Sequence, residues 1–286
     1  MENIVYLNGS FLAVNEAKIS ITDYGFLFGY SLFETMRAYN GKIFRLDDHL
    51  ERLKKSAEFL EIPINVTELK QAILDTLKKN EFQEARVRLV ISSGEGAVTP
   101  DTRSCKNPTI LIIAVGYSAY SQEVYARGFT AITSSIHRNS QSPLPNMKTS
   151  DLLESLLARR EARVAGVDDS ILLNDKGLVA EASSSNVFLV NKGILKTPQL
   201  GRGLLPGVTR KVIMELVRKT DIKFLEADIQ PKELMTSDED FLSNSMIEIM
   251  PLTTIDGKKV GSGKPGVVTQ KLMAAYRELV RKETGE

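Results

Sequence analysis

Alternation of apolar and polar residues predicts strands at the start of the chain, and helical spacing of apolar residues predicts two helices after them. Residues 4–14 predict a hairpin, and residues 33–44 predict a second pair of strands joined by a tight turn. Apolar residues recur every three or four positions over 46–60 and over 67–79, which is typical of amphipathic helices. Strands and helices that come in such blocks indicate an α+β unit over residues 1–117.

The second half of the chain has a different pattern, in which short apolar runs are separated by turn residues. Residues 170–182 and 187–197 each predict a hairpin, and residues 208–217 predict a helix after a glycine-rich loop. The polar stretch 118–128 is typical of an interdomain loop, so we expect a second, larger domain over residues 129–286. The predicted fold class is α/β (α+β) with two domains.

One predicted strand, residues 85–93, carries two arginines on the same face. Arg86 and Arg88 alternate with Val87 and Leu89, so the arginines point to one side of the sheet and the apolar residues to the other. Buried arginines need anions to offset their charge, whereas arginines on an edge strand are simply solvated. The pattern alone leaves both interpretations open.

Composition narrows the class of partner and of chemistry. The 286 residues include 37 Lys and Arg against 36 Asp and Glu, so no broad positive field attracts nucleic acid or an acidic membrane. No apolar run approaches the ~20 residues of a membrane span, and the first residues lack the pattern of a signal peptide, so we expect a cytoplasmic protein. With two histidines and the single cysteine Cys105, we expect neither a metal site nor an intrachain disulfide.

Lysine and carboxylate side chains are then the main candidates for catalysis. Lys148 lies between a proline-containing loop and a predicted amphipathic helix. The apolar face of this helix would be formed by Leu152, Leu153, Leu156 and Leu157. Glu181 lies in a strand of otherwise apolar residues, where a buried carboxylate needs a partner or a cationic ligand.

A phosphate site is suggested by the glycine-rich loop 201–207, which opens a helix at Val208 and Thr209, because free N–H groups at a helix N-terminus bind anions. Arg52 lies off the apolar stripe of its helix, so its default interpretation is a surface charge, although with Ser245 it could also bind a phosphate. A lysine for a Schiff base, a carboxylate for a ring nitrogen and a set of phosphate ligands together describe pyridoxal 5′-phosphate.

Ordered sequence blocks along nearly the whole chain resemble the class IV aminotransferases of fold type IV. This family includes branched-chain aminotransferase, D-amino-acid aminotransferase and 4-amino-4-deoxychorismate lyase. The blocks are Tyr6–Gly9, Asp23–Arg37, His49–Ala57, Met147-Lys148, Glu181–Phe188, Leu205–Arg210 and Ser243–Pro251. The resemblance implies a small α/β N-terminal domain and a larger C-terminal domain with a barrel-like sheet. It also implies a homodimer, or a higher homo-oligomer, in which residues 28–33 contribute to the neighbouring subunit's pocket.

The same resemblance implies roles for single residues. Lys148 would hold pyridoxal 5′-phosphate as a Schiff base and, once released, move a proton between the substrate Cα and the cofactor. Glu181 would pair with the pyridine nitrogen. The phosphate would be held by Arg52, Val208, Thr209 and Ser245, with Asn244 beside it.

The expected substrates are an amino acid and a 2-oxo acid such as 2-oxoglutarate, but the pocket residues divide between the relatives. Arg88 matches an arginine of the branched-chain enzymes, whereas Arg86 and Phe28 stand where those enzymes have tyrosines. D-amino-acid enzymes carry a tyrosine at the position of Phe33, yet the block that begins at Glu181 favours them. We therefore expect a D-amino acid such as D-alanine or D-glutamate, with L-branched-chain amino acids as the alternative and the lyase reaction after that. The expected substrate-binding residues are Phe28, Tyr30, Phe33, Arg86 and Arg88.

Overall fold

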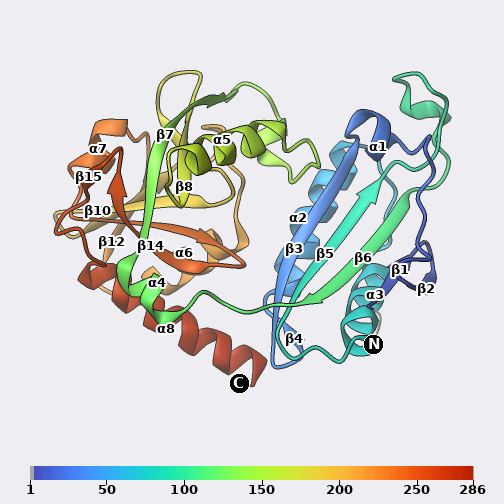
Figure 1. Cartoon of the computed structure of the whole chain (residues 1–286), viewed down its shortest axis with the longest axis horizontal. Coiled ribbons are helices and arrows are strands. Elements are labelled where there is room, and N and C mark those ends of the chain that lie inside the picture. Colours follow the sequence, from blue (N-terminus) through green and yellow to red (C-terminus); the bar gives the residue numbers. More distant parts are fainter. Residues whose placement is uncertain (1–2, 286) are drawn as a thin grey trace. The chain divides into compact units, whose positions relative to one another are not determined.

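The computed structural model describes residues 3–285, which fold into two compact units (Figure 1). The first unit comprises Met1–Ser118, Met147–Asp151 and Val280–Glu286, and the second unit comprises Ala119–Asn146 and Leu152–Leu279. Two short segments that are distant in sequence therefore complete the first unit. The domain limits expected from the sequence, at residues 117 and 129, stay a prediction.

The first unit is built on a six-stranded antiparallel sheet with the strand order β2-β1-β6-β5-β3-β4. Its strands are β1 (Ile4–Leu7), β2 (Ser10–Ala13), β3 (Ser31–Tyr39), β4 (Lys42–Ile43), β5 (Ala85–Ser92) and β6 (Thr109–Gly116). Turns at Asn8-Gly9 and Asn40-Gly41, where all four residues have positive φ, close the two predicted hairpins. Strand β5 pairs with β3 on one side and β6 on the other, so Arg86 and Arg88 lie on a central strand.

Helices α2 (Leu46–Phe59) and α3 (Val66–Lys79) pack on one face of this sheet. The core between them includes Leu32 and Val87 from the strands and Leu50 and Ile73 from the helices, none of them more than 2% exposed. The two amphipathic helices predicted from the spacing of apolar residues are confirmed. The opposite face of the strands carries the side chains that alternate with these core residues.

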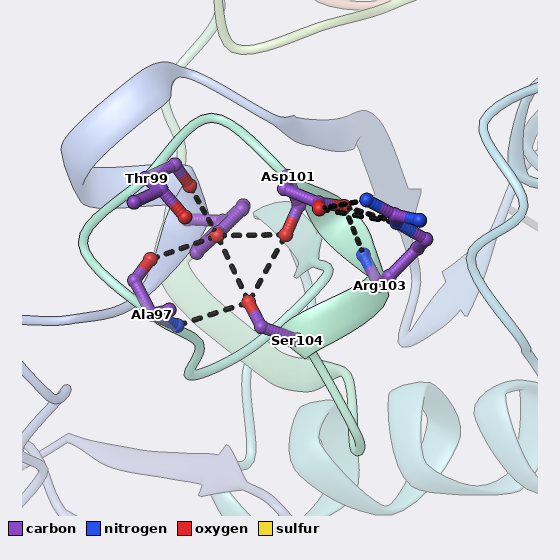
Figure 2. A network of polar contacts seen from close by, with 6 residues as sticks. Ala97, Thr99, Asp101, Arg103 and Ser104 are labelled. Atoms are coloured by element: carbon purple, nitrogen blue, oxygen red, sulfur yellow. Dashed lines mark hydrogen bonds and ion pairs between the residues drawn. The ribbon is translucent and has the colours of Figure 1, made fainter.

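The loop after β5 is organised around one buried hydroxyl. Tyr24, in the short helix α1 (Tyr24–Phe28), is 1% exposed, and its hydroxyl lies 2.8 Å from the carbonyl oxygen of Ala97 and 2.9 Å from that of Asp101. The hydroxyl also lies 3.0 Å from Ser104 Oγ, in the 3-10 helix η1 (Thr102–Ser104). Figure 2 shows how Ala97, Thr99, Asp101 and Ser104 gather at this point. These hydrogen bonds connect the loop to α1 through Tyr24.

The second unit is built on a nine-stranded mixed sheet with the order β12-β11-β10-β13-β14-β7-β8-β9, and β15 pairs with β14 off this path. Its strands are β7 (Phe129–Arg138), β8 (Asp169–Asn174), β9 (Val179–Ala182), β10 (Asn186–Asn191), β11 (Ile194–Pro198), β12 (Lys223–Ala227), β13 (Glu239–Asn244), β14 (Glu248–Ile255) and β15 (Lys258–Lys259). The predicted hairpins β8–β9 and β10–β11 are confirmed. Strand β9, at one end of the order, also contacts β10 and β11, so the sheet curls back on itself as the barrel-like expectation requires.

Several helices accompany the second sheet. They are α4 (Gln122–Arg127), the 3-10 helix η2 (Leu144–Asn146), α5 (Leu153–Val164), α6 (Val208–Val217), α7 (Pro231–Met235) and α8 (Val267–Thr284), whose last residues belong to the first unit. Over residues 3–285, none of the helices combines the length and the apolar character needed to cross a membrane.

The buried face of α5 differs from the prediction. Leu153 and Leu156 are each 63% exposed, whereas Ala158 and Ala162 are buried with relative exposures of 0% and 1%. The helix packs on β7 and β8 through small side chains, which let the helix backbone approach the sheet closely. Counting leucines at helical spacing therefore selected the wrong face of α5.

Candidate active site

Lys148 lies on an extended segment that pairs with the start of strand β3. The N–H of Phe33 donates to the carbonyl oxygen of Lys148 at 2.8 Å, and the N–H of Ser150 donates to that of Ser31 at 3.0 Å. Between these bonds, Thr149 forms an antiparallel bridge with Leu32. Helix α5 begins only at Leu153, so the backbone of the lysine is fixed by a neighbouring strand and not by a helix turn.

Two cations share the aromatic ring of Phe33. The Nζ atom of Lys148 lies 4.5 Å from the ring centroid, and the guanidinium carbon of Arg88 lies 4.0 Å from it. Phe33 is 4% exposed, and its buried ring attracts both positive charges through its π-electrons. Burial, and then the charge of Arg86, lower the pKa of Arg88 below its usual value. Three of the predicted site residues are therefore brought together within the first unit.

Arg86 is exposed and belongs to a row of arginines on the same face of the sheet. It lies directly opposite Arg37 in the pairing of β3 with β5, and its guanidinium carbon is 5.5 Å from the centroid of Tyr117. Arg37 lies 5.0 Å from the same ring and 4.2 Å from that of Tyr39. Arg37 is also paired with Glu84, at 3.5 Å. Arg86 and Arg88 are therefore the members of the row that suit a carboxylate ligand.

The structure does not gather Phe28 and Tyr30 with this cluster. The hydroxyl of Tyr30 donates to the carbonyl oxygen of Leu60 at 3.0 Å, and its ring packs against the helix-covered core of the first unit. Burial, and then the charge of Glu61, raise the pKa of Tyr30. Phe28 is 43% exposed and meets Tyr24 edge-on. Their roles in substrate binding stay predictions.

Arg52 is almost buried and is held by a carboxylate of the strand beneath its helix. Its Nε donates to Glu34 Oε1 at 2.8 Å and its Nη2 donates to Glu34 Oε2 at 2.6 Å, while His49 Nδ1 lies 2.7 Å from the same Oε2. The side chain of Arg52 is 10% exposed and that of Glu34 is 1% exposed. The default interpretation of Arg52 as a solvated surface charge is therefore wrong, because its guanidinium is almost buried in an ion pair with Glu34.

Glu181 lies on β9 in the second unit and is 7% exposed. Its Oε1 is 3.1 Å from Nη2 of Arg138, and its Oε2 accepts the N–H of Leu205 at 3.1 Å. Arg138 also reaches Glu154 Oε2 at 2.8 Å and Ser155 Oγ at 2.7 Å. The buried carboxylate thus has the cationic partner that its place in an apolar strand required.

The N-terminus of helix α6 is open to an anion in the way the sequence suggested. Gly207 is the N-cap residue and no side chain caps the helix, so Val208 and Thr209 begin it with backbone N–H groups in the first turn. Ser243, on β13 of the same unit, is 1% exposed, and its hydroxyl has no hydrogen-bond partner among residues 3–285. An open helix N-terminus and a buried hydroxyl with spare hydrogen-bonding capacity are donors that fit a phosphate.

Asn244 organises the turn that carries Ser245. Its Oδ1 accepts the N–H groups of Met246 at 2.8 Å and Ile247 at 2.9 Å, and its Nδ2 donates to Ser185 Oγ at 2.9 Å. A further bond joins Nδ2 to the carbonyl oxygen of Ser184 at 3.1 Å. The side-chain amide of Asn244 therefore forms its hydrogen bonds with the backbone and with Ser185. Its expected place beside the phosphate stays a prediction.

Replacing Gly207 with alanine will destabilise the protein by about 2 kcal/mol and weaken cofactor binding. An added Cβ would overlap Asn186 Oδ1 and lie 3.2 Å from its Cγ, and Asn186 Nδ2 donates to the carbonyl oxygen of Leu205 at 2.8 Å. Chemical denaturation and titration with pyridoxal 5′-phosphate measure both effects. Gly116→Ala is the matched control, because its added Cβ would meet only Phe82, at 3.6 Å. Equal behaviour of the two variants would contradict the prediction.

Several residues that had no role predicted from the sequence hold the predicted site residues in place. Glu34 orients Arg52 and is itself bonded to His49, and Arg138 partners Glu181. Asn186 ties the Leu205 loop to β10. A carboxylate inside an apolar strand identified Glu181, and a similar signal applies to Glu34, which follows Leu32 and Phe33 on β3.

Comparison with known proteins gives the family. The amino-transferase class IV family matches residues 31–255. A Methanocaldococcus jannaschii protein, which its name assigns provisionally as a branched-chain-amino-acid aminotransferase, is 37% identical over 278 residues, covering 96% of each chain. The branched-chain-amino-acid aminotransferase of Escherichia coli K12 is 30% identical over a 289-residue alignment, covering 98% of this chain and 94% of the relative.

Solved structures agree with this family over nearly the whole chain. That of the E. coli branched-chain amino acid aminotransferase has a TM-score of 0.93 at 30% identity and covers 98% of this chain and 95% of that chain. That of the branched-chain aminotransferase from Thermoproteus uzoniensis, solved with norvaline, has a TM-score of 0.90 at 32% identity and covers 97% and 94%. The small sheet and the curled sheet are those of fold type IV. The chain belongs to the class IV aminotransferases and is a pyridoxal-phosphate-dependent aminotransferase of fold type IV.

Proposed function

We propose that the chain transfers the amino group of an L-branched-chain amino acid to a 2-oxo acid, with 2-oxoglutarate as acceptor. The observation that carries this proposal is the similarity to branched-chain aminotransferases along almost the whole chain. The D-amino-acid preference expected from the sequence gives way to its alternative, because each relative named above bears the branched-chain name. None of the relatives named above bears a lyase name, so the lyase reaction stays the last alternative.

The arginine row of the first unit supports a dicarboxylate as the second substrate. Arg88 lies on the apolar ring of Phe33, so one pocket wall presents both a carboxylate partner and an apolar surface. A branched side chain would use the apolar surface, and the distal carboxylate of glutamate would use the arginine. Arg86 stands where branched-chain enzymes have a tyrosine, and its charge increases the preference for the dicarboxylate.

Different residues serve the proton transfer, the cofactor ring and the cofactor phosphate. Pyridoxal 5′-phosphate supplies the electron sink for the electron pair that remains when the substrate Cα loses its proton. With the cofactor bound, Lys148 Nζ would be the base that holds the proton removed from the substrate Cα. Glu181 is oriented by Arg138 and the N–H of Leu205, and it would accept a hydrogen bond from the ring nitrogen of the bound cofactor. The predicted phosphate ligands, which are Arg52, Ser245 and the first N–H groups of α6, would hold the phosphate.

The proposal is tested by single-turnover absorbance changes of the purified holoenzyme with L-leucine, L-glutamate, D-alanine and D-glutamate. We expect L-leucine and L-glutamate to change the cofactor spectrum much faster than the D-enantiomers. Faster reaction with D-alanine or D-glutamate would overturn the substrate proposal and leave the family assignment intact.

Assembly and location complete the proposal. The expected homodimer and cytoplasmic location stay predictions. Sedimentation velocity of the holoenzyme tests the dimer, for which we expect a species of twice the 31.7 kDa chain mass.

A further inference from the structure

A buried ionic cluster of the first unit joins β3 to helix α2 through a single carboxylate. Glu34 accepts from Nε and Nη2 of Arg52 and from Nδ1 of His49. The side chains of Glu34 and His49 are 1% and 2% exposed. Arg52 and His49 are three residues apart and so lie on the same face of α2, which places both donors over one acceptor.

The charges in this cluster can be assigned. Burial alone would raise the pKa of Glu34, but the charge of Arg52 and the hydrogen bonds from His49 and Arg52 lower it to about 2, so the carboxylate is ionised near neutral pH. Burial lowers the pKa of His49, against the raising effect of Glu34, so the ring is neutral and Nδ1 carries the proton that it donates. Glu34 and Arg52 together therefore carry no net charge.

We propose that Glu34 is a positioning residue that fixes the direction of the Arg52 guanidinium for the cofactor phosphate. This inference rests on the proposed role of Arg52. A guanidinium held through Nε and Nη2 cannot rotate about its last side-chain bonds, so its remaining N–H groups keep one orientation. The negative charge of Glu34 offsets the positive charge of Arg52 that attracts a phosphate. Any contribution of Glu34 to phosphate binding must therefore come from the orientation of the guanidinium and not from charge.

The substitution Glu34→Gln distinguishes the effect of guanidinium orientation from the effect of charge. Loss of orientation would weaken phosphate binding, whereas loss of the negative charge would strengthen it. The amide keeps one acceptor and gains a donor NH2, which must face either Arg52 Nε or the pair formed by Arg52 Nη2 and His49 Nδ1. The guanidinium therefore loses at least one of its two anchors. If charge alone mattered, removal of the carboxylate would strengthen phosphate binding.

The test compares the dissociation constants of pyridoxal 5′-phosphate and pyridoxal for the apoprotein, measured by absorbance without any substrate. We expect Glu34→Gln to reduce the preference for the phosphorylated form by about 10-fold or more, the value of one or two hydrogen bonds to a charged group. Glu51→Gln is the control, because Glu51 lies on the same helix, is 56% exposed and pairs with Lys55, which is 73% exposed. We expect it to leave the preference unchanged.

Glu34→Asp provides a second variant if Glu34→Gln does not fold. It keeps the charge but shortens the side chain, so it cannot hold both nitrogens of Arg52, and we expect the same loss of preference. A purely structural role would weaken both ligands equally, and an unchanged or increased preference for the phosphate would overturn the proposal. Because no amino acid is present, the result does not depend on whether the enzyme prefers branched-chain substrates.

Discussion

Replacing Lys148 with alanine will lower the turnover number of the transaminase by about 10⁴-fold, because the same amine attaches the cofactor and moves the proton. The purified variant will show the absorbance of non-covalently bound cofactor and will no longer respond rapidly to L-leucine. Stopped-flow spectra of the half-reaction measure both properties.

Lys258→Ala serves as the control for this loss. Lys258 is an exposed residue of strand β15, so its removal changes the charge of the protein by the same amount without touching the site. We expect the control to retain normal turnover. Turnover that survives in Lys148→Ala would contradict the assignment of the catalytic base.

Replacing Glu181 with glutamine will lower turnover by about 100-fold, because a neutral amide stabilises a protonated ring nitrogen far less than a carboxylate does. It will also cost about 3 kcal/mol of unfolding free energy, since Arg138, only 12% exposed, loses its buried anionic partner. Steady-state kinetics with saturating cofactor and urea denaturation measure the two losses separately.

Glu154→Gln is the matched control, because Glu154 pairs with the same arginine at 2.8 Å but is 51% exposed. A half-exposed ion pair contributes little to stability. Turnover and stability near those of the unchanged protein are expected. If Glu154→Gln caused the larger loss, the function of Arg138 would be to bind α5 and not to hold Glu181.

The parts of the fold that depend on local pattern could be predicted from the sequence. The hairpins turn at Asn-Gly pairs and at glycine-containing turns, and the helices α2, α3 and α6 follow the spacing of their apolar residues. The pattern failed at α5, where alanines face the sheet and Leu156 faces solvent. Periodicity measures where large apolar residues lie, whereas close packing of a helix on strands is decided by where small residues lie.

The residues of the candidate active site could likewise be predicted only in part from the sequence. Lys148 and Glu181 stood out because each is an unusual residue for its local setting, and the family resemblance gave them roles. Arg52 looked solvated because its partner, Glu34, comes from a strand 18 positions earlier and no helical pattern reveals it. Substrate preference depended on single pocket residues such as Arg86, which differ among relatives of one fold, so it needed comparison along the whole chain.

The pairing of Lys148 with Phe33 also has a consequence for the order of folding. The two residues are 115 positions apart (148 − 33), so a long loop must close before the backbone bond between them can form. In a nascent or refolding chain, helices α2 and α3 can form and pack early from local contacts. The segment that carries Lys148 can pair with β3 only later, after strand β7 and the loop that follows it are available. The appearance of cofactor colour during refolding therefore marks the completion of this distant contact.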